Sequence, residues 1–91
     1  MKTVVIDGGR IYDRESAHNY IAERLGFPDY YGKNLDALHD CLCEMGEDVN
    51  IVIYRKERLV DSLEHYGEIM LEVFEHAAQD NIHITLAFDG E

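Results

Sequence analysis

The sequence predicts one α/β domain over residues 1–91, with a three-stranded parallel sheet packed against about four helices. Three short runs rich in β-branched residues, at residues 3–6, 50–54 and 82–88, predict the strands. Two helical stretches separate each pair of consecutive runs, which gives the order β-α-α-β-α-α-β. Strands separated by helices pair in parallel through right-handed crossovers. A chain of 91 residues holds one domain with one modest core.

The first helix is predicted after the turn formed by residues 7–9. Asp13 suits its N-cap, and Glu15 in the first turn is favourable for the helix dipole. Gly26 at the C′ position and Pro28 shortly after it predict where the helix ends. Its apolar face contains Ala17, Tyr20, Ile21 and Leu25.

The second helix follows the loop of residues 27–33, with Asn34 as its N-cap. At about 100° per residue, two stripes separate on its surface. Cys41 lies at the edge of the apolar stripe and is expected to act as a small buried hydrophobe. The apolar stripe contains Leu35, Leu38, Leu42 and Met45. The solvent stripe contains Asp36, His39, Asp40, Cys43 and Glu47.

Two further helices and the central strand complete the prediction. Leu59, Val60 and Leu63 predict a short third helix, and Gly67 is expected to separate it from a fourth. The run at residues 51–53 is apolar throughout, as a central strand covered on both faces should be. The apolar face of the fourth helix contains Ile69, Met70, Val73, Phe74 and Ala77.

The net charge of −11 argues against nucleic acids and anionic membranes as partners and favours a basic protein. Acidity for solubility alone explains the charge equally well. Residues 59–91 contain eight acidic residues and no lysine or arginine, so the whole C-terminal third is negative. No run approaches the roughly 20 apolar residues of a membrane span. Cys41 and Cys43 are two residues apart, so on a helix they point to different sides and do not easily pair. Both are interpreted as reduced thiols of a cytoplasmic protein.

Asp36 and Asp40 lie one helical turn apart. Like charges at this spacing cost a few tenths of a kcal/mol in an isolated helix, which suggests that they are presented to a cation. A plain solvated helix face is the alternative interpretation. Tyr30 and Tyr31 in the preceding loop are typical of interface anchors, although Tyr31 is expected to pack beneath the loop.

The segment Y-Y-G-K-N-L-D-A-L-H-D-C-L at residues 30–42 closely resembles the core motif of the barstar family, intracellular inhibitors of small secreted ribonucleases. The similarity extends to the first strand, to Val73 and Phe74, and to residues 82–85. It implies a barstar-like fold with a three-stranded parallel sheet and four helices. It also implies an inhibitor without cofactors that binds one small basic ribonuclease as a monomer.

The resemblance further implies that the second helix and its preceding loop enter the ribonuclease active site. Asp40 would lie where the substrate phosphate binds, Asp36 would meet a neighbouring basic residue, and Tyr30 would pack on a catalytic histidine. His39 and His76 replace a tryptophan and an acidic contact residue of the best-known member. The implied partner-binding set is Tyr30, Gly32, Asn34, Leu35, Asp36, His39, Asp40, Cys43 and His76.

Three other interpretations remain open. The two carboxylates could act as acid and base, but the sequence contains no phosphate-binding loop or hydrolase motif and predicts no cleft around them. His39 and Cys43, with Asp36 or Asp40, could bind a metal, although ligands from one exposed helix make a poor site, so no metal is predicted. The changes at His39 and His76 also allow an immunity or interaction protein whose partner is another nuclease or another basic protein.

Overall fold

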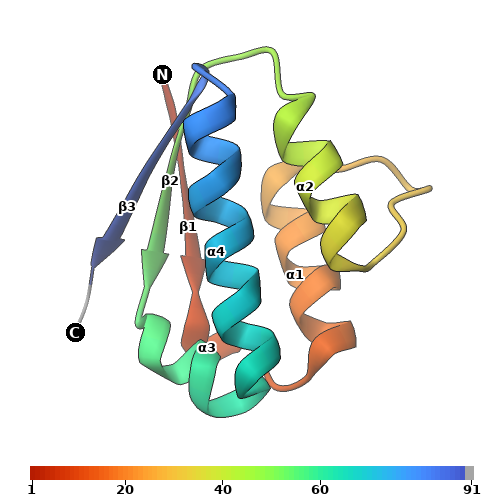
Figure 1. Ribbon diagram of the computed structural model, residues 1–91, viewed down its shortest axis with the longest axis vertical. Coiled ribbons are helices and arrows are strands. Elements are labelled where there is room, and N and C mark those ends of the chain that lie inside the picture. Colours follow the sequence, from red (N-terminus) through yellow and green to blue (C-terminus); the bar gives the residue numbers. More distant parts are fainter. Residues whose placement is uncertain (90–91) are drawn as a thin grey trace.

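The computed structural model describes residues 1–89 and confirms the predicted element order (Figure 1). The three strands are β1 (Lys2–Asp7), β2 (Val49–Tyr54) and β3 (Ile84–Asp89). All pairings are parallel and the spatial order is β1-β2-β3, so β2 is central. The helices are α1 (Arg14–Leu25), α2 (Leu35–Cys43), α3 (Lys56–Leu63) and α4 (His65–Asp80), and one 3-10 turn covers Gly8–Arg10.

One face of the sheet carries the core. Side chains alternate along the central strand, so that Val49, Ile51 and Ile53 are buried while Val52 is only half-buried. On the outer face Val5, which pairs with Val52, is 39% exposed. The expectation that the central strand is covered on both faces is therefore wrong, because the buried side chains all lie on one face.

The helices pack next to one another, and α4 lies between the sheet and α2 (Figure 1). Its predicted apolar face is largely confirmed, since Met70, Phe74 and Ala77 are buried and Ile69 and Val73 are half-buried. This arrangement positions α2 as an outer helix, with Leu38 and Leu42 buried and the opposite side open to solvent.

The prediction that Gly67 separates α3 from α4 is wrong. The break is at Glu64, whose φ of 56° interrupts the helix, and Gly67 lies buried in the first turn of α4. A Cβ atom on Gly67 would lie 3.0 Å from Leu59 Cδ2 and 3.1 Å from Leu63 Cβ. Glycine is therefore needed here because α3 and α4 approach closely, and the turn itself does not require it.

Two other boundaries differ from the predicted ones. The last strand begins at Ile84, since Ile82 lies in the preceding turn with 93% of its surface exposed. Helix α2 ends at Cys43, so that Met45 and Glu47 lie in the connection to β2. Met45 still packs against the core, but Glu47 is not part of the helical stripe.

Candidate functional site

The start of α2 is fixed by its cap and by the loop before it. Asn34 Oδ1 accepts a hydrogen bond from the Ala37 N–H at 2.7 Å, as an N-cap should. The Asn34 side-chain amide also donates to the Gly32 carbonyl at 3.3 Å. A Cβ on Gly32 would lie 3.2 Å from Ala37 Cβ, so the loop packs closely on the first turn. Leu35 is half-buried against the core.

The loop is anchored from below by Tyr31, which is buried as predicted. Its hydroxyl lies 2.7 Å from Nδ1 of buried His18, whose Nε2 lies 2.7 Å from the Tyr66 hydroxyl. Phe27 adds a ring contact to Tyr31, with 5.1 Å between centroids. A neutral imidazole has one donor and one acceptor, so one tyrosine donates to His18 and the other accepts from it. Burial lowers the pKa of His18, which favours this neutral form.

With Tyr31 held beneath the loop, Tyr30 is 87% exposed in the loop before α2. Asp36 and Asp40 are also exposed, one turn apart on the solvent side of the helix. Within residues 1–89, neither carboxylate makes a side-chain hydrogen bond or an ion pair. The structure therefore leaves Tyr30 exposed in the loop before α2 and Asp36 and Asp40 exposed on the helix itself.

The far end of α2 is capped by a residue that the sequence reasoning missed. The side-chain amide of buried Asn81 donates to the carbonyls of Leu42 at 2.9 Å and of Met45 at 3.0 Å. The last carbonyls of a helix lack the usual partner four residues on. The Leu42 carbonyl accepts from the Met45 N–H at 3.3 Å, and Asn81 adds a second donor to it from just beyond α4. The sequence shows only that an asparagine lies between a predicted helix and a predicted strand. The structure is needed to show which carbonyls it binds.

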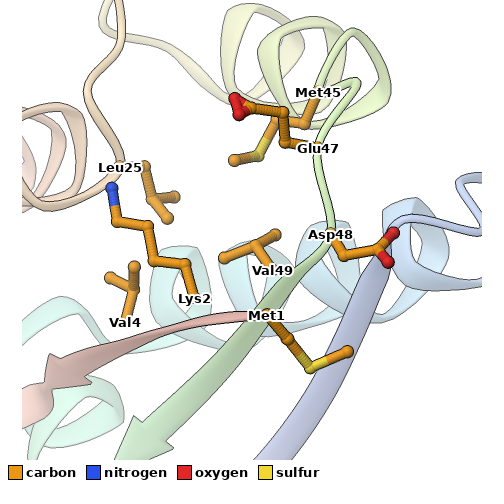
Figure 2. Close-up of a pocket in the computed structure, with 8 residues that line it drawn as sticks. All are labelled: Met1, Lys2, Val4, Leu25, Met45, Glu47, Asp48 and Val49. Atoms are coloured by element: carbon orange, nitrogen blue, oxygen red, sulfur yellow. The ribbon is translucent and has the colours of Figure 1, made fainter.

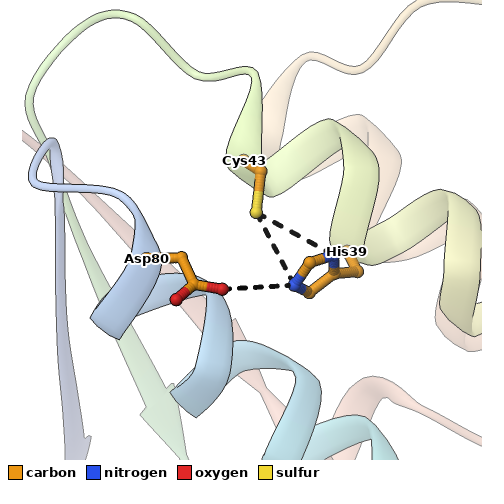
Figure 3. A group of neighbouring side chains, drawn as sticks. All are labelled: His39, Cys43 and Asp80. Carbon is orange, nitrogen blue, oxygen red and sulfur yellow. Dashed lines mark hydrogen bonds and ion pairs between the residues drawn. The ribbon is translucent and has the colours of Figure 1, made fainter.

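His39 and Cys43 meet a third group that comes from α4 (Figure 3). His39 Nε2 lies 3.6 Å from Cys43 Sγ and 3.8 Å from Asp80 Oδ2. Burial, together with the negative charges of Asp80 and Asp40, raises the pKa of the Cys43 thiol. His76 is exposed one turn before Asp80, so it shares that side of α4.

The two cysteines differ in their burial. Both are free thiols. Cys41 is half-buried against the core, in line with its predicted role, and burial followed by the charges of Glu44 and Asp40 raises its pKa. Cys43 is exposed on the same side of α2 as His39.

One cavity lies away from this surface. A cavity of about 460 Å³ opens beside the amino ends of β1 and β2 and is lined by Lys2, Leu25, Met45 and Asp48 among others (Figure 2). In α/β sheets ligands bind at the carboxyl ends of strands, which is the opposite edge. The Asp48 carboxylate is also occupied, since it lies 2.9 Å from His83 Nδ1. This cavity therefore lacks the convergent reactive groups of an active site.

No helix within residues 1–89 is long and apolar enough to cross a membrane.

Comparison with known proteins agrees with the fold. Residues 1–89 match the family model described as "Barstar (barnase inhibitor)". A Bacillus subtilis (strain 168) protein named "Putative ribonuclease inhibitor YrdF" is 36% identical over 81 residues, which cover 88% of this chain and 89% of that protein. The matched family is one of inhibitors and not of enzymes. The chain belongs to the barstar family.

Proposed function

We propose that this protein inhibits a small basic ribonuclease by inserting α2 and the preceding loop into its active site. Asp40 occupies the position of the substrate phosphate, and Asp36 binds a neighbouring basic side chain. Tyr30 packs on a catalytic histidine, while Gly32, Asn34 and Leu35 line the contact. His39, Cys43 and His76 lie at its edge toward α4.

The observation that carries this proposal is a pair of exposed carboxylates one turn apart on α2, Asp36 and Asp40, for which residues 1–89 offer no side-chain partner. Unpaired like charges one turn apart cost stability in the free protein. That cost is reversed when arginine, lysine or protonated histidine groups approach, because a carboxylate accepts the same charge-assisted hydrogen bonds as a phosphate.

The rigid support of this surface favours tight binding. Asn34 and Asn81 cap the two ends of α2, and Tyr31 holds the loop against buried His18. A surface that is already in its binding conformation loses little conformational entropy on association. Little of the favourable interaction free energy is then spent on ordering this surface, and the affinity is higher as a result.

The charge of the chain suits the same partner. At a net charge of −11, long-range attraction accelerates encounter with a basic enzyme, and salt screens that attraction. The acidic surface also repels nucleic acid, so inhibition arises from occluding the enzyme and not from sequestering its substrate. Binding is one to one, because one helix and loop fill one active site.

Competition with an active-site ligand tests the proposal. A guanosine 3′-monophosphate probe is bound to a small basic guanyl-preferring ribonuclease, and this protein is titrated in. The proposal predicts that the inhibitor displaces the nucleotide with one-to-one stoichiometry and that inhibition of RNA cleavage is competitive. A ternary complex that retains the nucleotide would contradict phosphate mimicry while leaving inhibition intact.

A second candidate is an immunity protein with the same fold and a different basic partner. His39 favours it, because this histidine contacts Cys43 and Asp80 where the best-known family member has a tryptophan. The large apolar contact of that tryptophan is therefore missing. Tight binding to another nuclease, with no effect on guanyl-preferring ribonucleases, is the result that would select this candidate.

We also propose a cytoplasmic location, where the inhibitor protects the cell from the ribonuclease. Both thiols are free, and the cytosol keeps thiols reduced. Fractionation of cells that express the untagged protein tests this location.

A further inference from the structure

The geometry points to a zinc-binding site formed by His39 and Cys43 of α2 and Asp80 of α4. This site is separate from phosphate mimicry, and its test uses the metal alone without any ribonuclease. Its three ligand atoms lie within 4.8 Å of one another (Figure 3). From the sequence alone, the available third ligand is Asp36 or Asp40, and a site made by one exposed helix is a poor one. The structure removes that objection, because the third ligand comes from a second helix.

The distances match a tetrahedral ion. Zinc with bonds of about 2.3 Å to sulfur and about 2.0–2.1 Å to nitrogen holds these two ligands roughly 3.5 Å apart. The observed distance between Cys43 Sγ and His39 Nε2 is 3.6 Å. The same geometry separates nitrogen and oxygen ligands by roughly 3.3 Å, and His39 Nε2 lies 3.8 Å from Asp80 Oδ2. A small rotation of the Asp80 side chain, which is 65% exposed, closes this difference.

His39 and Cys43 lie within hydrogen-bonding range for sulfur, but Asp80 is too far from His39 to complete a hydrogen-bonded triad. Hydrogen bonds to nitrogen or oxygen lie mostly between about 2.7 and 3.2 Å, and the contact between His39 and Asp80 exceeds that range. The cluster is therefore close enough to share one ion but too open to be a well-formed hydrogen-bonded triad. An ion between the three atoms would supply the missing interactions.

The donor set favours zinc over magnesium and calcium. Thiolate and imidazole are poor ligands for magnesium and calcium, which prefer oxygen, whereas zinc accepts sulfur, nitrogen and oxygen together. On binding, the Cys43 thiol releases its proton to solvent and ligates as thiolate. Three protein ligands leave the fourth position to water, because the site is open to solvent.

The fold brings the three ligands close together without the metal. Two residues of one helix separated by four positions lie on the same side, which sets His39 beside Cys43. Asn81, the residue after Asp80, binds the carbonyls at the end of α2 and so fixes the end of α4 against it. Cys41 lies on another side of α2, half-buried against the core, and does not contribute.

The test is titration of untagged, reduced protein with Zn²⁺ in competition with a chromophoric chelator. We expect one zinc per chain. Cys43→Ser and Asp80→Asn should each weaken zinc binding by at least about 10–100-fold. Loss of an outer-shell partner of a metal ligand already weakens binding by roughly this factor, and these substitutions remove direct ligands. The matched controls Cys41→Ser and Asp61→Asn should bind as the wild type does.

A spectroscopic measurement excludes loss of fold as an explanation. With Co²⁺ in place of zinc, the wild type should show a sulfur-to-cobalt charge-transfer band and the intense visible bands of tetrahedral cobalt. Cys43→Ser should lose the charge-transfer band while keeping its far-ultraviolet circular dichroism. No zinc binding by the wild type, or equal binding by Cys43→Ser and the wild type, would overturn the assignment.

Discussion

The hydroxyl of Tyr31 lies 2.7 Å from Nδ1 of buried His18, and this contact ties the loop before α2 to α1. The other ring nitrogen of His18 lies 2.7 Å from the Tyr66 hydroxyl in α4. One histidine therefore joins the loop, α1 and α4. The exposed position of Tyr30 depends on this arrangement, because its neighbour Tyr31 is held in the core.

Tyr31→Phe should destabilise the protein by about 1–3 kcal/mol, since it leaves a buried ring nitrogen of His18 without a partner. Urea denaturation monitored by circular dichroism measures the change. The control is Tyr30→Phe, which removes the hydroxyl of an exposed ring and should change the free energy of unfolding by less than about 0.5 kcal/mol. Equal effects of the two substitutions would contradict the anchoring role of Tyr31.

Stability should fall as the pH is lowered below the ordinary pKa of histidine, about 6.5. Burial lowers the pKa of His18 in the folded protein, so the unfolded chain binds the proton more readily. The contribution of His18 is complete above the unfolded pKa and is lost as the pH falls toward the folded pKa. The groups that face the ring, Tyr31 and Tyr66, stay neutral because burial raises the pKa of both hydroxyls.

Chemical denaturation of the wild type and of His18→Gln at pH 7.5, 6.5 and 5.5 checks this pH dependence. The variant should be less stable at pH 7.5, and its stability should change less between pH 7.5 and 5.5 than that of the wild type. Parallel pH profiles for the two proteins would show that His18 does not carry the effect.

Asn81→Ala should cost about 1–3 kcal/mol, because the carbonyls of Leu42 and Met45 lose the donor that caps α2. The substitution should also accelerate amide hydrogen exchange at the end of α2, and should accelerate it less in the sheet. Gln79→Ala is the control, since this side chain is exposed and should contribute little. Unchanged exchange in α2 would show that Asn81 does not hold the helix end.

Gly67→Ala should destabilise the protein by about 1 kcal/mol. The added methyl group would crowd Leu59 and Leu63 at 3.0–3.1 Å, and such overpacking costs more than the roughly 1 kcal/mol that alanine gains in helix propensity. The control is Gly46→Ala, where a Cβ would meet nothing within 4 Å. Thermal unfolding of both variants measures the difference, and a stabilised Gly67→Ala would contradict the close approach of α3 and α4.

The element order was predictable because local signals agree with the fold. Apolar periodicity identified the buried faces of α2 and α4, and Asp13 and Asn34 both cap helices as predicted. The wrong predictions concern positions where tertiary contacts, and not local sequence signals, determine the structure. Gly67 resembles a helix break in the sequence, but the chain breaks at Glu64 and Gly67 serves the packing of α3 on α4.

Part of the candidate site could be predicted from the sequence because α2 supplies most of it. The spacing of Asp36 and Asp40 identified the solvent side of the helix, and both are exposed. Asp80 and Asn81 could not be assigned in this way. They lie roughly 40 residues away along the chain, and only the packing of α4 against α2 brings them to the site.

The affinity of Asp40→Asn for a small basic guanyl-preferring ribonuclease tests the central claim most directly. This substitution keeps the shape of the side chain and removes its charge. Truncating or neutralising one member of a desolvated charge pair costs about 2–5 kcal/mol, a range that measurements on barstar complexes helped to define.

The matched control is Asp61→Asn, an equal change of charge on α3. Phosphate mimicry predicts a loss of this size for Asp40→Asn, near wild-type affinity for Asp61→Asn, and wild-type binding that weakens with salt. Equal affinities for the two variants would contradict it.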